Sequence, residues 1–295
     1  MTGEPTPSNH ARRTLSPLFW AVIIFVVAQY LNFCVSVQIK HYVAVNQITS
    51  PQFPLQFPLV YFFVTVAVIG IVLFLIPVSK IKIVFRILFA VLFAWGTFIS
   101  FALILQIIVS AIAAVIAGSV WFFQPRIWLH NLLLVLTLAS GVSLFGFLLS
   151  PWTAIALMLV LAIYDFLAVR FGYMVWMARK LSESETLPAF FIPFSLSDWN
   201  LDLRKIGAGL FDEAPAEREF SVLGGGDIGF PLLLVASVFF ASGFTQSLAV
   251  AVFALLGLIG AFLIQRLFLK GKPMPALPPI AFASLIGFVI VSYLL

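Results

Sequence analysis

Two aspartates, Asp165 and Asp227, lie inside long apolar stretches of the sequence. An ionisable side chain in hydrocarbon is costly, so such residues usually face a polar cavity and mark a functional site. Neither aspartate has a basic residue in the interior of an apolar stretch with which it could form a structural ion pair. Two carboxyl groups that meet in a low dielectric cannot both ionise cheaply, so they share a proton and titrate as a pair.

A pair of this kind can hold and activate a water molecule. The ionised carboxylate takes a proton from the water, the protonated one donates to a substrate carbonyl, and a tetrahedral intermediate collapses. Aspartic proteases use this chemistry. The alternative is a proton-relay pair in a transporter or channel, because the cost of burial alone applies equally to both functions.

The composition places these aspartates in a membrane. Of 295 residues, 63% are apolar and 9% are charged, against about 45–50% and about 25% in soluble domains. A soluble fold cannot bury so much apolar surface, so we predict an integral, multi-pass protein of the cell membrane. The net charge of +5 comes from scattered basic residues, which argues against nucleic acid as a partner.

Length arithmetic divides the apolar stretches into spans of about 20 residues. The first spans are predicted at about 17–37 and 54–78. Residues 81–123 form one stretch that as a single helix would be about 65 Å long, twice the thickness of the hydrocarbon core. We therefore predict a break near 100–106, and the same argument places breaks at 150–151 in the stretch 131–170 and near 241–247 in the stretch 220–269. A last span follows Pro279, which gives nine.

The distribution of basic residues tests this count. With the N-terminus in the cytosol, every Lys and Arg except Lys40 falls on the cytosolic side, as the positive-inside rule requires. The sequence thus predicts an all-α, nine-helix membrane protein with a cytosolic N-terminus and an outer C-terminus.

A polar segment divides the chain into residues 1–170 with six spans, a cytosolic loop at 171–219, and residues 220–295 with three spans. Weak alternation indicates a strand at Trp199–Leu203, and the simpler interpretation is a solvated, partly flexible loop. The loop holds eight of the 11 acidic residues: Glu183, Glu185, Asp198, Asp202, Asp212, Glu213, Glu217 and Glu219.

Of the three other acidic residues, Glu4 lies in the N-terminal tail, and the two intramembrane aspartates match in depth. Asp165 lies five residues before Arg170, about 7–8 Å from the cytosolic end of its span, and Asp227 lies eight residues after Glu219, about 12 Å in. Consecutive antiparallel spans are usually neighbours, so we expect the two carboxyl groups to meet in the inner part of the membrane.

Three short motifs surround these positions: Tyr164-Asp165, the run Gly224-Gly225-Gly226-Asp227, and Pro275-Ala276-Leu277 before the last span. Together, in this order in a nine-span chain, they resemble the presenilin and signal peptide peptidase family of intramembrane aspartyl proteases, and the small size is similar to that of archaeal or bacterial single-chain members. The resemblance covers nearly the whole chain from Leu18.

The resemblance implies that Asp165 and Asp227 are catalytic, that the glycines shape the site, and that the stretch from Pro275 to Leu277 positions substrate. Tyr164 belongs to the same substrate-binding set. The central Gly225 departs from the usual motif and is expected to loosen the helix start. Without the resemblance, the glycines are equally consistent with close helix packing, and the proline-rich stretch, expected to stay out of a helix, with a simple turn.

Other chemistry has little support. A single Cys and three His exclude a disulfide framework and leave little for zinc, no HExxH occurs, and we place His10, His41 and His130 in the tail or loops. No metal or cofactor is expected. Ser143 has no His at its depth, which argues against a serine protease dyad.

Substrates are expected to be transmembrane segments or remnant signal peptides within the bilayer. A transporter and a proteolytically silent scaffold are the alternatives, and the oligomeric state stays open.

Overall fold

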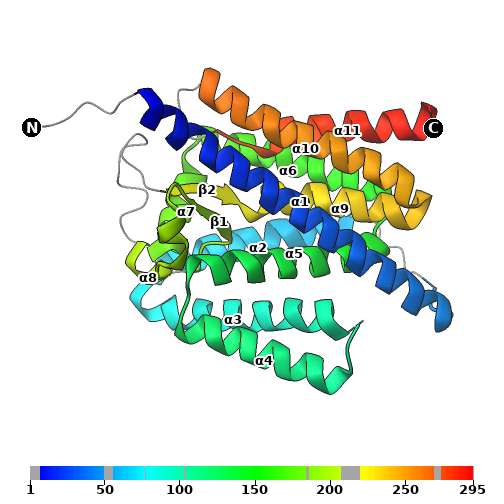
Figure 1. Ribbon diagram of the computed structural model, residues 1–295, viewed down its shortest axis with the longest axis horizontal. Helices are drawn as coiled ribbons and strands as arrows, with labels where there is room; N and C mark the ends of the chain where they lie inside the picture. The colour runs from blue at the N-terminus through cyan, green and yellow to red at the C-terminus, as the bar shows by residue number, and fades with distance from the viewer. Residues whose placement is uncertain are drawn as a thin grey trace, which may run out of the picture.

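The computed structural model describes residues 7–49, 56–76, 78–102, 104–183, 186–206, 220–268 and 274–294. The described chain is mostly helical, with one short β-hairpin (Figure 1). The long helices are α1 (Pro7–Val45), α2 (Gln56–Leu75), α3 (Val78–Ala102), α4 (Ile107–Phe123), α5 (Ile127–Leu148), α6 (Pro151–Arg170), α9 (Gly225–Ser242), α10 (Phe244–Leu267) and α11 (Leu277–Leu294).

All three predicted helix breaks are confirmed. α3 and α4 are separate helices, divided between Ala102 and Ile107. Between α5 and α6, Ser150 caps the new helix by accepting from the backbone N–H of Thr153 at 3.2 Å, and Pro151 follows at its first position, where its fixed φ suits a helix start. Between α9 and α10, Gly243 turns the chain with a φ of 98°, a conformation that glycine adopts at no steric cost.

Six of these helices are long and apolar enough to cross a membrane, and three shorter apolar segments accompany them. The shorter ones are Phe63–Val72 in α2, Ile107–Phe123 in α4 and Leu277–Tyr293 in α11. The bundle agrees with an integral multi-pass protein. The exact count of nine spans and the direction of insertion stay predictions.

The helix α9 lies at the centre of the bundle. Its span is 67% buried, more than any other candidate span, and it packs against α1, α5, α6, α10 and α11. The α3–α4 hairpin packs against α5 at one side of the bundle (Figure 1). Many large apolar side chains of the outer helices are exposed, as expected where lipid replaces water.

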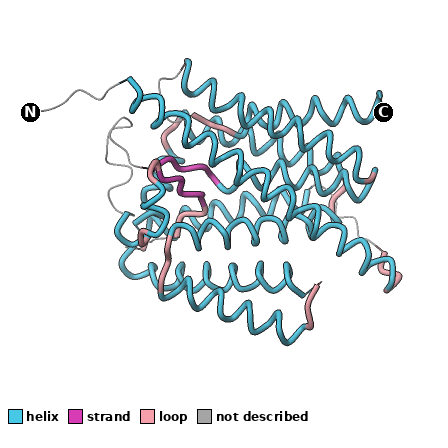
Figure 2. Tube along the Cα trace, in the orientation of Figure 1, coloured by secondary structure: helices cyan, strands magenta, loops and turns pink. Residues whose placement is uncertain are grey.

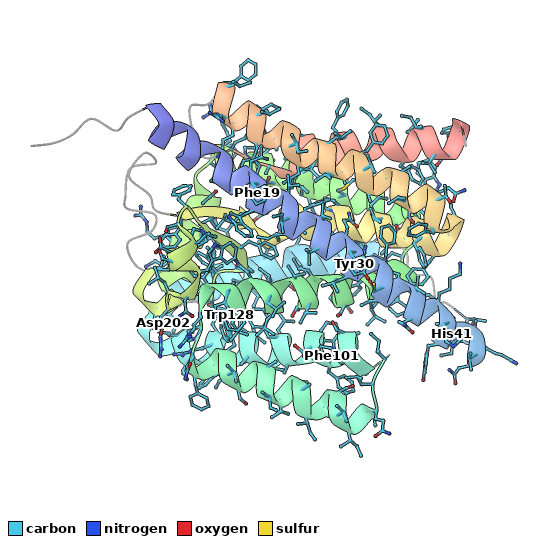
Figure 3. The ribbon with its side chains drawn as sticks, in the orientation of Figure 1. Phe19, Tyr30, His41, Phe101, Trp128 and Asp202 are labelled. Atoms are coloured by element: carbon cyan, nitrogen blue, oxygen red, sulfur yellow. The ribbon has the colours of Figure 1, made fainter. Side chains whose placement is uncertain are left out.

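The two strands sit at one end of the bundle, and β2 runs directly into α9 (Figure 2). β1 (Ala189–Pro193) and β2 (Phe220–Gly224) form an antiparallel pair, with Ala189 opposite Gly224. α1 begins near this end, and α11 ends at the opposite end (Figure 1). In Figure 3, Phe19, Tyr30 and His41 mark the course of α1 from the hairpin end to the far end.

The strand predicted at Trp199–Leu203 is wrong. Leu196–Asn200 forms a 3-10 helix, η1, and Leu203–Ile206 a short helix, α8. The segment is held on the turn before α5, where the Arg126 guanidinium donates to Asn200 Oδ1 at 2.8 Å and the backbone of Arg126 pairs with that of Asp202. This part of the loop is therefore folded. The predictions for residues 184–185 and 207–219 lie outside the described residues.

Three other expectations need correction. Residues 220–224, taken as the start of a span, form β2, because the chain pairs with β1 before it enters the bundle. Pro278 and Pro279 lie within the first turn of α11, where the missing N–H groups would have no helical partner in any case. His130 lies in α5 and is fully buried. An amphipathic helix, α7 (Tyr173–Glu183), also follows α6.

Candidate active site

Asp165 lies on α6 and is only 8% exposed. Its helix packs against α9 and α11, so the side chain faces the interior of the bundle. The backbone N–H of Leu277, the first residue of α11, donates to Asp165 Oδ2 at 3.4 Å. This contact brings the start of the last apolar helix to the first aspartate.

Asp227 lies in the first turn of α9 and is half-buried. Gly224 is the N-cap of this helix, and the Asp227 carboxyl group lies back against it, since a Cβ on Gly224 would be 2.9 Å from Asp227 Oδ2. An acidic side chain three residues into a helix commonly returns towards the N-cap. The start of α9 thus holds Asp227 close to the end of β2.

The helices that carry the two aspartates pack against each other. Asp165 lies on α6, which also contacts α11, and Asp227 lies in the first turn of α9. The packing of α6 against α9 agrees with the expectation that these consecutive spans are neighbours, and the meeting of the two carboxyl groups stays a prediction.

The glycines before Asp227 allow the close approach of the hairpin. The Gly225 N–H donates to the Pro188 carbonyl at 2.9 Å, and a Cβ at Gly225 would lie 2.8 Å from that same oxygen. A Cβ at Gly224 would lie 2.9 Å from Asp227 Oδ2. Gly225 therefore belongs to a tight contact between the hairpin and α9. The helix begins at Gly225 with this hydrogen bond, so its start is held in place and not loosened as we expected. Gly226 is exposed.

The remaining predicted site residues lie before α11 and on α6. Met274, Pro275 and Ala276 precede α11 without regular secondary structure and are partly buried. Tyr164 packs edge-to-face on Phe63 of α2, with 6.0 Å between ring centroids. Tyr164 therefore lies on the side of α6 that faces α2.

The hairpin has one covered edge and one open edge. Asn131 of α5 donates from Nδ2 to the Phe191 carbonyl at 2.7 Å, and the Phe191 N–H donates to Asn131 Oδ1 at 3.1 Å. Both backbone groups of Phe191 thus point away from β2, so Phe191 and its partner Val222 form a pair without mutual hydrogen bonds. The backbone of Val222 then points to the other edge of β2, on which the described chain places no further strand.

His130 and Asn131 were not among the residues predicted to form the site. His130 Nε2–H donates to the Ala189 carbonyl at 3.1 Å, and Ala189 lies two residues before Phe191, the partner of Asn131. The available signal was two adjacent polar residues at the start of an apolar span, where buried polar groups need partners. Their actual partner, a strand some 60 positions later, has no signature in the local sequence.

Comparisons with known proteins agree with this architecture. The family model for signal-peptide peptidase, presenilin aspartyl protease matches residues 22–294. Two solved structures of a presenilin family intramembrane aspartate protease, in space groups C222 and P2, are similar to this chain with TM-scores of 0.60 and 0.62. Each is 20% identical in sequence to this chain. The match to the C222 structure covers 93% of this chain and 96% of that one, and the match to the P2 structure covers 95% and 98%.

At this identity the two structures establish a common fold. No curated protein matches the chain significantly. The family match spans the helices that carry both aspartates, the hairpin and the start of α11. This chain belongs to the signal-peptide peptidase and presenilin family of aspartyl proteases.

Proposed function

We propose that this protein is an intramembrane endopeptidase whose catalytic residues are Asp165 and Asp227. The observation that carries the proposal is the packing of α6, with Asp165 buried and the Leu277 N–H on it, against α9, whose first turn carries Asp227. Its substrates are peptide bonds within transmembrane segments or remnant signal peptides.

In the proposed reaction, the ionised aspartate accepts a proton from a water molecule held between the two. The water oxygen bonds to the scissile carbonyl carbon, and the protonated aspartate gives its proton to the carbonyl oxygen. Collapse restores the C=O bond, breaks the C–N bond, and returns a proton to the leaving amine. The two carboxyl groups end with one proton between them, ready for the next cycle.

A helical substrate must unwind before attack, because its carbonyls are engaged in helix hydrogen bonds. The open edge of β2 supports a route for this step. The backbone of Val222 points away from β1, five residues before Asp227, and no further strand of the described residues pairs there. An extended peptide can add to such an edge as a further strand. We propose β2 as the docking strand, in place of Trp199–Leu203, with the Pro275–Leu277 stretch on the α11 side.

Cleavage of one model transmembrane peptide by purified protein, with products identified by mass spectrometry, tests the proposed activity. Peptides N-methylated at single positions near the cut test the docking strand, because N-methylation removes one N–H and leaves the side chains. Alternate positions point towards β2, so inhibition should follow a period of two. A flat profile would exclude strand addition, and uncleaved parent peptide would exclude the protease.

The alternative function, a proton or cation transporter, is tested by a flux assay beside the cleavage assay. Liposomes holding the protein would then show proton or cation flux that depends on both aspartates, without peptide products. Family membership favours the protease.

A further inference from the structure

Side chains from the first turn of α5 form hydrogen bonds with the backbone of β1, on the edge of the hairpin away from β2. The Asn131 side chain makes both a donor and an acceptor contact to one residue of β1, at 2.7 and 3.1 Å, which is the pattern that a neighbouring strand would supply. His130 adds a contact to Ala189 at 3.1 Å. Asn131 is 4% exposed and His130 is fully buried, so neither contact competes with solvent.

The side-chain chemistry at position 131 is specific. Only a carboxamide offers an N–H donor and a carbonyl acceptor close enough to satisfy both backbone groups of Phe191. Asp at this position keeps the acceptor and loses the donor, and Leu loses both. In either case a buried backbone group is left without its partner, which is costly in a dry interior.

A short chain of contacts connects Asn131 to the aspartates. Asn131 fixes Phe191 in β1, β1 pairs with β2 in a defined register, and the Pro188 carbonyl holds Gly225 at the start of α9. Asp227 follows two residues later. A shift of β1 along α5 would therefore move both the docking edge and the start of the helix that carries Asp227.

We propose that Asn131, supported by His130, is a positioning residue that locks the hairpin to the bundle and so determines which peptide bond of a substrate reaches the aspartates. By covering the edge of β1, the same side chains leave the outer edge of β2, of the two strands in the described residues, for a substrate to join. This inference rests on the proposed protease function and on strand addition to β2.

The test compares Asn131→Leu, Asn131→Asp and Asn131→Gln with the wild-type protein. For a model transmembrane peptide, Leu and Asp should lower kcat by about 10- to 100-fold, the size expected for small misplacement at a reacting centre, with a smaller change in KM. They should also spread cleavage over neighbouring peptide bonds. Gln keeps both hydrogen-bonding groups on a longer side chain, so it should recover part of the rate.

Asn32→Leu is the matched control. Asn32 is also a buried carboxamide, and it donates to the Leu232 carbonyl of α9 at 3.2 Å and accepts from the Ser143 hydroxyl of α5 at 2.8 Å, so these partners lie in helices rather than in the hairpin. This substitution should lower thermal stability without changing the distribution of cleavage positions. If the Asn131 variants lose rate only in proportion to folded protein, with cleavage positions unchanged, Asn131 is structural and the proposal fails.

Hydrogen–deuterium exchange separates this proposal from the proposed activity. In the Asn131→Leu protein, peptides covering 187–193 and 220–226 should exchange faster while those of α10 and α11 do not. Faster exchange here supports the lock even if the wild-type protein cleaves nothing, a result that would overturn the protease alone. Unchanged exchange at the hairpin would overturn the lock.

Discussion

The backbone N–H of Leu277 donates to Asp165 Oδ2 at 3.4 Å across 112 positions of sequence. The contact places the start of α11 at the aspartate of α6, and the side chain of Leu277 is itself buried at 3% exposure. A proline-rich stretch before a helix thereby supplies a hydrogen-bond donor to a buried carboxyl group.

This relationship predicts different effects for two substitutions at one position. Leu277→Ala keeps the N–H and should cost about 2–5 kcal/mol of stability through lost packing, with a modest change in rate per folded molecule. Leu277→Pro removes the N–H and should lower the rate per folded molecule further. Thermal unfolding and peptide cleavage on the same samples measure both. Equal loss of rate in the two variants would mean that Leu277 acts only by packing.

The aspartates themselves give the strictest test of the chemistry. Asp165→Asn and Asp227→Asn should each reduce cleavage by at least about 100-fold, since an amide neither accepts the proton of water nor donates one as an acid. Folding should persist, because the amide keeps the shape and avoids a buried charge. Asp198→Asn, at a partly exposed acid of η1, is the control and should cleave normally. Near-normal cleavage by either site variant would contradict the aspartyl-protease mechanism and favour the transporter function.

The rate should depend on pH as a bell-shaped curve. The mechanism needs one ionised and one protonated carboxyl group, so activity should fall at low pH, when both are protonated, and at high pH, when both are ionised. Initial rates across pH, with thermal stability recorded at each pH, measure this. A rate that rises steadily with pH would point to a single base.

An ion pair in the segment between α6 and α9 should not distort the acid limb of this curve. The hydrogen bond from Arg204 lowers the pKa of Asp202 below its ordinary value of 3.8. The contact therefore adds stability above that value, and the stability is lost only as pH falls through the lowered pKa. Because the pair is partly exposed, its contribution is small. Loss of rate in mildly acidic buffer would thus report on the aspartates.

Gly225 should tolerate no side chain. In Gly225→Ala, the new Cβ would lie 2.8 Å from the Pro188 carbonyl oxygen, so the hairpin or the helix start must move, at about 1–3 kcal/mol. Cleavage should fall together with stability.

Gly260→Ala is the matched control, because nothing lies within 4 Å of a Cβ there. It should be neutral or stabilising, since alanine favours helix. If Gly225→Ala is equally harmless, the strand-to-helix contact does not position Asp227.

The sequence alone determined the features that depend on local composition and length. The membrane location, the three helix breaks and the choice of Asp165 and Asp227 all follow from the cost of placing polar groups in hydrocarbon and from the rise of a helix. The resemblance carried by the motifs around them identified the family that the whole-chain match confirms.

Only the tertiary structure decided where the strands form and what holds them. The hairpin uses residues 189–193 and 220–224 rather than 199–203, because pairing depends on which backbone groups find partners across the fold, not on alternation within one segment. His130 and Asn131 read as ordinary polar residues at a span boundary. Their contacts to Ala189 and Phe191 exist because folding brings α5 against β1, and no local pattern encodes a partner 59 or 60 positions away.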